Sequence, residues 1–156
     1  MRRNPPASSV QDSLGGLIVA VAKRLSEAGR QALVDAGLGH LSFGRIGVLS
    51  FLIDGAGTQA ELCRALRQKP PSMGELLQRL AKEGLVDSEA DPNDGRRTNW
   101  SLTARGERDI LKARTVFRQS AKQIDRALDA LGVTNNELGR IKQVLAGLLE
   151  ANPGET

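Results

Sequence analysis

Two prolines, Pro70 and Pro71, interrupt the middle of the chain between two short segments of helical periodicity. Proline lacks a backbone N–H and fixes φ, so one helix cannot run through this pair. The pattern Thr58-Gln59-Ala60-Glu61 before the break is a capping box and predicts a helix from there to about residue 67. Ser72-Met73-Gly74-Glu75 has the same pattern and predicts a second helix over about 71–83. The sequence therefore predicts two short helices placed head to tail across a tight break.

A β-hairpin is predicted directly after the second helix. Gly84 suits the left-handed conformation that ends a helix, and Leu85 can fold back on the last turn. The run LVDSEA is followed by the turn residues DPNDG and then by RRTNWSLT, in which apolar and polar positions alternate. Trp100 shares one hairpin face with Leu102, so we expect it in the core.

Amphipathic helices flank this central part. Apolar positions spaced by three and four predict a long helix over residues 14–33, and Ser42 is the expected cap of a shorter helix over 46–53. A long charged helix is predicted from Thr103 to residue 131, and a capping box at residues 134–137 opens a last helix. The predicted fold is mainly α with a small β-hairpin wing, in the element order of a winged helix-turn-helix.

Composition excludes several classes of protein. One Cys and one His exclude a disulfide framework and the usual zinc sites, and with no Tyr most nucleophile and acid–base arrangements lack members. We therefore expect no enzyme, no metal site and no cofactor. The longest apolar stretch, residues 16–22, is too short to span a membrane. A secretory signal at this stretch is disfavoured by Asp12 and two prolines, so we expect a cytoplasmic protein.

The placement of charge favours a DNA partner. Three Phe and one Trp are few aromatic rings for a protein that stacks unpaired bases, which favours duplex DNA. Residues 64–82 hold five basic side chains and one acidic, whereas residues 83–94 hold five acidic and no basic ones. Arg96 and Arg97 then restore positive charge at the hairpin tip. Cations therefore lie at both places expected to face phosphate: in and just before the second short helix, expected in the major groove, and on the wing, expected at the neighbouring minor groove or backbone.

Residues 84–106 resemble the wing region of the multiple-antibiotic-resistance regulator (MarR) family. The matching motifs are Gly84-Leu85-Val86, Asp91-Pro92-x-Asp94-x-Arg96 and Leu102-Thr103-x-x-Gly106. The segment from Thr58 to Leu62 also fits, so the resemblance covers about residues 58–106. It implies a homodimeric bacterial transcription regulator, usually a repressor released by a small ligand.

The resemblance and the charge pattern together give the expected DNA contacts. Arg96 is the wing residue that the resemblance places in the minor groove, and Asp94 can orient its guanidinium. Where many family members have Thr or Ser followed by Arg, this chain has Gly74-Glu75, and Glu75 either caps the helix with Ser72 or accepts from cytosine. The full set of DNA-binding candidates is Gln59, Gln68, Lys69, Ser72, Glu75, Gln78, Arg79, Asp94, Arg96 and Arg97.

The resemblance also implies that the first helix and the last two helices form a dimer interface. The predicted organisation is a disordered tail at 1–9, a dimerisation helix at 10–41, a DNA-binding domain at 42–105 and dimerisation helices at 106–151. Apolar residues expected at the interface are Leu14, Leu17, Val21, Leu128, Leu131, Leu138, Ile141, Leu145 and Leu148.

Three residues near the turn between the first two helices, His40, Phe43 and Arg45, are candidates for an effector pocket. A lone His in a loop is otherwise an ordinary surface residue. Cys63 lies among apolar residues and is expected to be a structural thiol.

Two functions remain open at this point. The first is a dimeric regulator that binds an inverted-repeat duplex operator. For this function we also expect a small-molecule effector. The second is a winged-helix module that binds other proteins without sequence-specific DNA binding.

Overall fold

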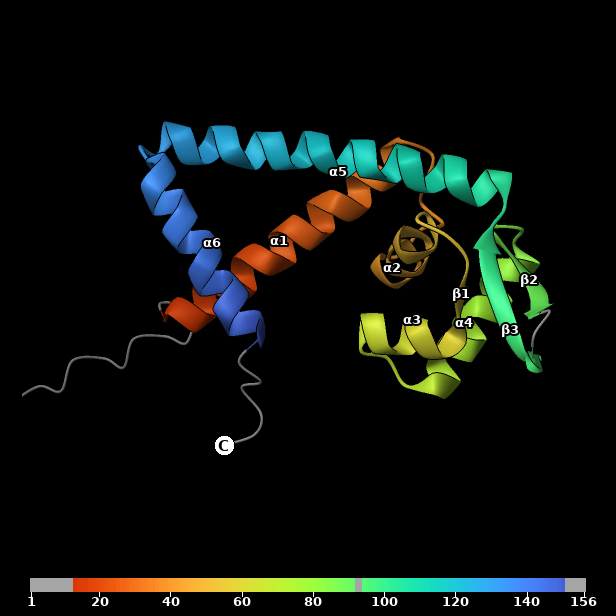
Figure 1. Ribbon diagram of the computed structural model, residues 1–156. Helices are drawn as coiled ribbons and strands as arrows, with labels where there is room; N and C mark the ends of the chain where they lie inside the picture. The colour runs from red at the N-terminus through yellow and green to blue at the C-terminus, as the bar shows by residue number, and fades with distance from the viewer. Residues whose placement is uncertain (1–12, 92–93, 151–156) are drawn as a thin grey trace, which may run out of the picture. The chain divides into compact units, whose positions relative to one another are not determined.

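The computed structural model describes residues 13–91 and 94–150, and the side chains of 91 and 94–96 are outside that description. The predicted tail at 1–9 also lies outside it. The chain divides within one helix into two compact units, Met1–Phe117 and Arg118–Thr156. The elements in order are α1 (Leu14–Asp35), α2 (Phe43–Leu52), β1 (Gly57–Thr58), α3 (Gln59–Leu66), α4 (Pro70–Lys82), β2 (Val86–Asp91), β3 (Asp94–Leu102), α5 (Ala104–Ala130) and α6 (Asn135–Glu150) (Figure 1).

Local sequence signals set most of these boundaries. The Ser42 hydroxyl accepts a hydrogen bond from the Arg45 N–H at the start of α2, and Thr103 does the same for Gly106 at the start of α5. The predicted capping box at residues 134–137 is present at the start of α6. These residues confirm the predicted caps, and the helix after Ser42 begins at Phe43, three residues before its predicted start.

The hairpin is part of a three-stranded antiparallel sheet in the order β1-β3-β2. Trp100 of β3 pairs with Ser88 of β2 on one side and with Gly57 of β1 on the other. The short strand β1 was not predicted, because two residues are too few to give an alternating pattern. It ties the start of α3 to the root of the wing.

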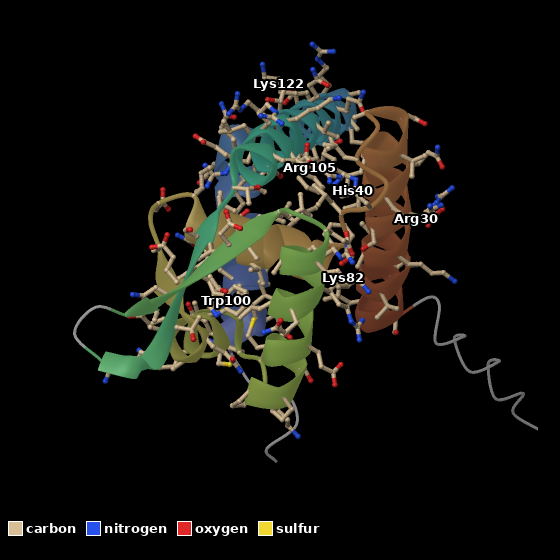
Figure 2. The ribbon with its side chains drawn as sticks, turned by 90° about the vertical axis from the view of Figure 1, so that its right-hand side faces the viewer. Arg30, His40, Lys82, Trp100, Arg105 and Lys122 are labelled. Atoms are coloured by element: carbon tan, nitrogen blue, oxygen red, sulfur yellow. The ribbon has the colours of Figure 1, made fainter. Side chains whose placement is uncertain are left out.

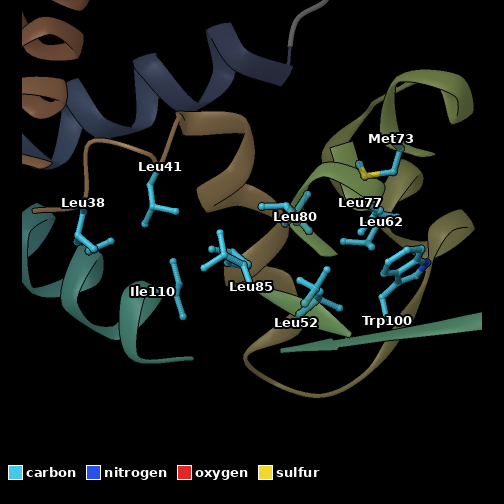
Figure 3. Close-up of a cluster of buried hydrophobic side chains, with 14 of the residues drawn as sticks. Leu38, Leu41, Leu52, Leu62, Met73, Leu77, Leu80, Leu85, Trp100 and Ile110 are labelled. Carbon is cyan, nitrogen blue, oxygen red and sulfur yellow. The ribbon is translucent and has the colours of Figure 1, made fainter. Parts of the chain in front are cut away.

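One hydrophobic core holds the first unit together (Figure 3). Its side chains come from α1 to α5, the connecting loops and the hairpin. Each helix therefore buries its apolar face against the other elements. The buried members labelled in Figure 3 are Leu38, Leu41, Leu52, Leu62, Met73, Leu77, Leu80, Leu85, Trp100 and Ile110. The predicted core position of Trp100 is confirmed, since its side chain is 4% exposed.

Candidate nucleic-acid interface

The helix-turn-helix begins with the predicted capping box of α3. The Thr58 Oγ1 accepts from the Glu61 N–H at 3.3 Å, and the Glu61 Oε2 accepts from the Thr58 N–H at 2.8 Å. These hydrogen bonds from Thr58 lower the pKa of Glu61, with smaller contributions from the charges of Arg64 and Arg97. Glu61 therefore remains an anion close to two arginines.

The second helix begins two residues earlier than its predicted cap. Pro70 is the first residue of α4, and Lys69 occupies the N-cap position without a side-chain cap. A proline fits here because the first N–H groups of a helix have no intrahelical partner and its φ is already helical. The predicted capping box between Ser72 and Glu75 is therefore wrong.

Gln59 connects the two helices across the break. Its Nε2 donates to the Pro70 carbonyl oxygen at 2.7 Å, so this amide is engaged within the chain. A Cβ at Gly74 would lie 3.2 Å from the same Nε2, tighter than an ordinary contact. The glycine that departs from the family pattern thus lets the start of α3 lie close to α4.

The two faces of α4 differ sharply. Met73, Leu77 and Leu80 are fully buried, which fixes the helix on the core. Glu75 Oε2 and Arg79 Nη2 lie 3.1 Å apart, with side chains that are 71% and 67% exposed. An ion pair this exposed contributes little and can be exchanged for other partners. The predicted contact residues Gln68, Lys69, Ser72, Glu75, Gln78 and Arg79 are all exposed.

The wing follows through a tight helix end. Gly84 has φ +70°, and the Leu85 N–H donates to the Leu80 carbonyl oxygen at 2.9 Å, as expected for a glycine-terminated helix. Arg97 is exposed on β3, near the tip. Asp94 and Arg96 belong to the same strand, but their side chains are outside the described part of the structure.

A ring of polar contacts holds the C-terminal end of α4 in place. The Arg45 guanidinium forms two hydrogen bonds to the Glu83 carboxylate, at 2.5 and 2.6 Å, and a third to the His40 carbonyl oxygen. Arg105 donates to the Glu83 carbonyl oxygen at 2.9 Å, and Asp109 lies 3.0 Å from the His40 Nε2. Figure 2 shows His40 and Arg105 close together. Sequence reasoning missed this ring.

The Arg45–Glu83 pair predicts a pH-dependent contribution to stability. Hydrogen bonds from Arg45 lower the pKa of Glu83, so the pair stabilises the fold above the unfolded pKa and is lost as pH falls through the folded pKa. We expect Glu83→Gln to lower the free energy of unfolding by about 1 kcal/mol at pH 7, because the carboxylate is partly solvated. Urea titrations should show this difference shrinking below about pH 4.5. An equal difference at pH 3 and pH 7 would contradict the assignment.

A cavity of about 530 Å³ lies beside α1 and the loop that follows it. Two of the three effector-pocket candidates, His40 and Phe43, line it, and Phe43 packs on Phe117 with ring centroids 6.0 Å apart. Arg45 is not among its lining residues, because its guanidinium is held by Glu83. Its complete lining is Lys23, Ser26, Glu27, Arg30, Leu33, Gly39, His40, Leu41, Ser42 and Phe43.

Large apolar side chains are exposed at both ends of the chain. On α1 these include Leu14, Leu17 and Val21, whose side chains are more than half exposed in the single chain. In the second unit they include the predicted interface residues Leu131, Ile141, Leu145 and Leu148, whereas Leu128 and Leu138 are half-buried. Within the described residues, no helix is long and apolar enough to cross a membrane.

The arrangement defines a winged helix-turn-helix domain. Residues 41–97, which are 57 of the chain's 156 residues, match the model of the MarR family. The resemblance to this family that the sequence predicts is confirmed over these residues, and the predicted fold class is confirmed. No curated protein sequence matches the chain.

Solved structures share the fold over most of the chain. A DNA complex of MepR from S. aureus is 21% identical with a TM-score of 0.74, covering 89% of this chain and 98% of that one. A probable transcriptional regulator from Pseudomonas aeruginosa is 24% identical, with a TM-score of 0.68 and coverage of 89% and 98%. Wild-type MarR from E. coli, in the apo form, is 21% identical, with a TM-score of 0.65 and coverage of 88% and 96%.

Proposed function

We propose that the protein is a homodimeric transcription regulator that binds an inverted-repeat operator in duplex DNA, most simply as a repressor. The observation that carries this proposal is the exposed polar face of α4 beside a wing that bears Arg97. In this assignment α4 enters the major groove and the wing tip reaches the adjacent minor groove. The solved MepR complex, a protein of the same fold bound to DNA, supports it.

A dimer follows from the apolar side chains that a single subunit leaves exposed. Large apolar side chains exposed in such number usually mark an interface, and a two-fold dimer presents two copies of α4 to DNA. We propose that residues 10–41 and 106–151 provide the interface and that residues 42–105 bind DNA. Two recognition helices about one DNA turn apart would then read two half-sites.

Release by a small molecule is a further part of the proposal. The cavity beside α1 has apolar lining from Leu33 and Phe43, and its charged rim holds Lys23 and an Arg30–Glu27 ion pair, so it suits a small apolar molecule with a polar end. A ligand there weakens DNA binding only if it prefers the form with lower DNA affinity. A repressor of this kind would act in the cytoplasm.

The wing assignment is tested with Arg96→Ala. We expect weaker duplex binding at every sequence and a salt slope reduced by about 0.9, because one phosphate or minor-groove contact is lost. Fluorescence anisotropy over a range of salt concentrations measures both quantities. Arg114→Ala, which removes an exposed charge from α5, is the matched control and should bind as the parent does. Unchanged binding by Arg96→Ala would refute the wing assignment.

A further inference from the structure

A groove of about 470 Å³ lies between the start of α3, the exposed face of α4 and strand β3. Trp100 is one of its lining residues, and Figure 2 labels it between the hairpin and α4. Gln78 lines it from α4, Arg64 from α3 and Arg97 from β3. The complete lining is Thr58, Gln59, Ala60, Glu61, Arg64, Gln78, Arg97, Thr98 and Trp100. We call this the α4–wing groove.

The groove lies between α4 and the wing, and this position limits which part of a bound DNA duplex can reach it. The major and minor grooves of a duplex alternate and are separated by a single sugar–phosphate strand. If α4 lies in the major groove and the wing tip in the adjacent minor groove, that strand must cross between them. The α4–wing groove lies in this gap. The inference therefore rests on the proposed function.

The chemistry of the lining suits a phosphate group. Arg64 and Arg97 are both exposed. The two residues are 33 positions apart in sequence, and the fold brings their guanidinium groups to one groove. Gln78 adds an amide donor, and the first turn of α3 adds the positive end of a helix dipole. Glu61 is the carboxylate among the lining residues, and its Oε2 is already engaged by the N–H and hydroxyl of Thr58.

Glu61 has a second effect in the groove. Its pKa is lowered chiefly by the Thr58 hydrogen bonds, so at neutral pH it is an anion that attracts both Arg64 and Arg97. At so exposed a site this attraction is weak, so both guanidinium groups can turn from Glu61 to a phosphate when DNA binds.

We propose that the α4–wing groove binds one phosphate of the DNA strand that separates the two grooves, with Arg64 and Arg97 as its paired cationic ligands. Arg64 is not among the contact residues predicted from sequence, because on α3 it has the appearance of an ordinary solvated charge. The structure gives it a partner in Arg97 and a place beside the recognition helix.

The test uses the full-length protein and the duplex protected in a footprint. Arg64→Ala and Arg97→Ala should each reduce the salt slope of binding by up to about 0.9, which is at most about a threefold smaller loss of affinity between 50 and 200 mM salt. Since both arginines share one phosphate, the double variant should reduce the slope by about one contact, not two. Arg64→Lys, which keeps the charge, should retain the parental slope.

A single neutral methylphosphonate in the duplex locates the contact. Placed on the strand between the two grooves, it should weaken the parent about as much as Arg64→Ala does and have no further effect on that variant. Arg114→Ala is again the control. Parental binding with an unchanged slope for Arg64→Ala would overturn this inference, as would slopes of the two single variants that add in the double variant. Absence of parental binding at low salt would instead refute the proposed function.

Discussion

Replacing Gly106 by Ala is expected to destabilise the protein by about 3 kcal/mol, an unusually large effect for one methyl group. A Cβ at this buried position would lie 2.0 Å from the Leu85 carbonyl oxygen. This oxygen belongs to the backbone, so it cannot move aside as the end of a flexible side chain could. The same oxygen accepts the Thr103 N–H at 3.2 Å, so displacement would also break the joint between α5 and the root of the wing.

Urea denaturation of Gly106→Ala and of a matched variant, Gly44→Ala, measures this effect. An added Cβ at Gly44 meets nothing within 4 Å, and alanine favours a helix over glycine, so Gly44→Ala should leave stability unchanged or slightly raised. Similar stabilities for the two variants would show that Gly106 does not lie against Leu85. The result also bears on the motif Leu102-Thr103-x-x-Gly106, because the close approach explains why its last position requires glycine.

The double variant Leu145→Arg, Leu148→Arg is expected to convert the protein to a monomer and to weaken operator binding by about a hundredfold or more. Both side chains lie exposed on α6, and two buried charges without partners would prevent subunits from packing there. A monomer binds a single half-site and loses the gain from linking two binding events, which is on the order of 10² to 10⁴.

Light scattering and anisotropy on the same samples separate the two consequences. Gln143→Arg, which adds a charge at another exposed position of α6, is the control and should remain a dimer that binds DNA. A parent that is monomeric at micromolar concentration would refute the proposed dimer. A double variant that remains dimeric would show that this face of α6 is outside the interface.

Much of the fold follows from local signals, which is why it could be predicted. The Thr58–Glu61 box, the Gly84 helix end and the Thr103 cap each act within a few residues, and each is present where the sequence predicts it. The Ser72 cap failed because Pro70 starts α4 first, so two local signals competed and the earlier one prevailed.

The contacts that sequence could not predict are those between distant residues. Arg45 and Glu83 are 38 positions apart, and His40 and Asp109 are 69 apart, so no spacing rule joins them. Their partners depend on how α4 and α5 pack on the core. Arg64 and Arg97 are also far apart in sequence, so the sequence shows Arg64 only as one of several basic residues. The fold places both arginines at one groove.

The most direct test of the proposed function is a footprint of the purified protein on the DNA beside its own gene, at stated low salt. The proposal predicts a protected inverted repeat whose half-sites are centred about one helical turn apart, because two copies of α4 occupy successive major grooves on one face of the duplex. Absence of protection at low salt would contradict it and would favour a winged-helix domain that binds another protein.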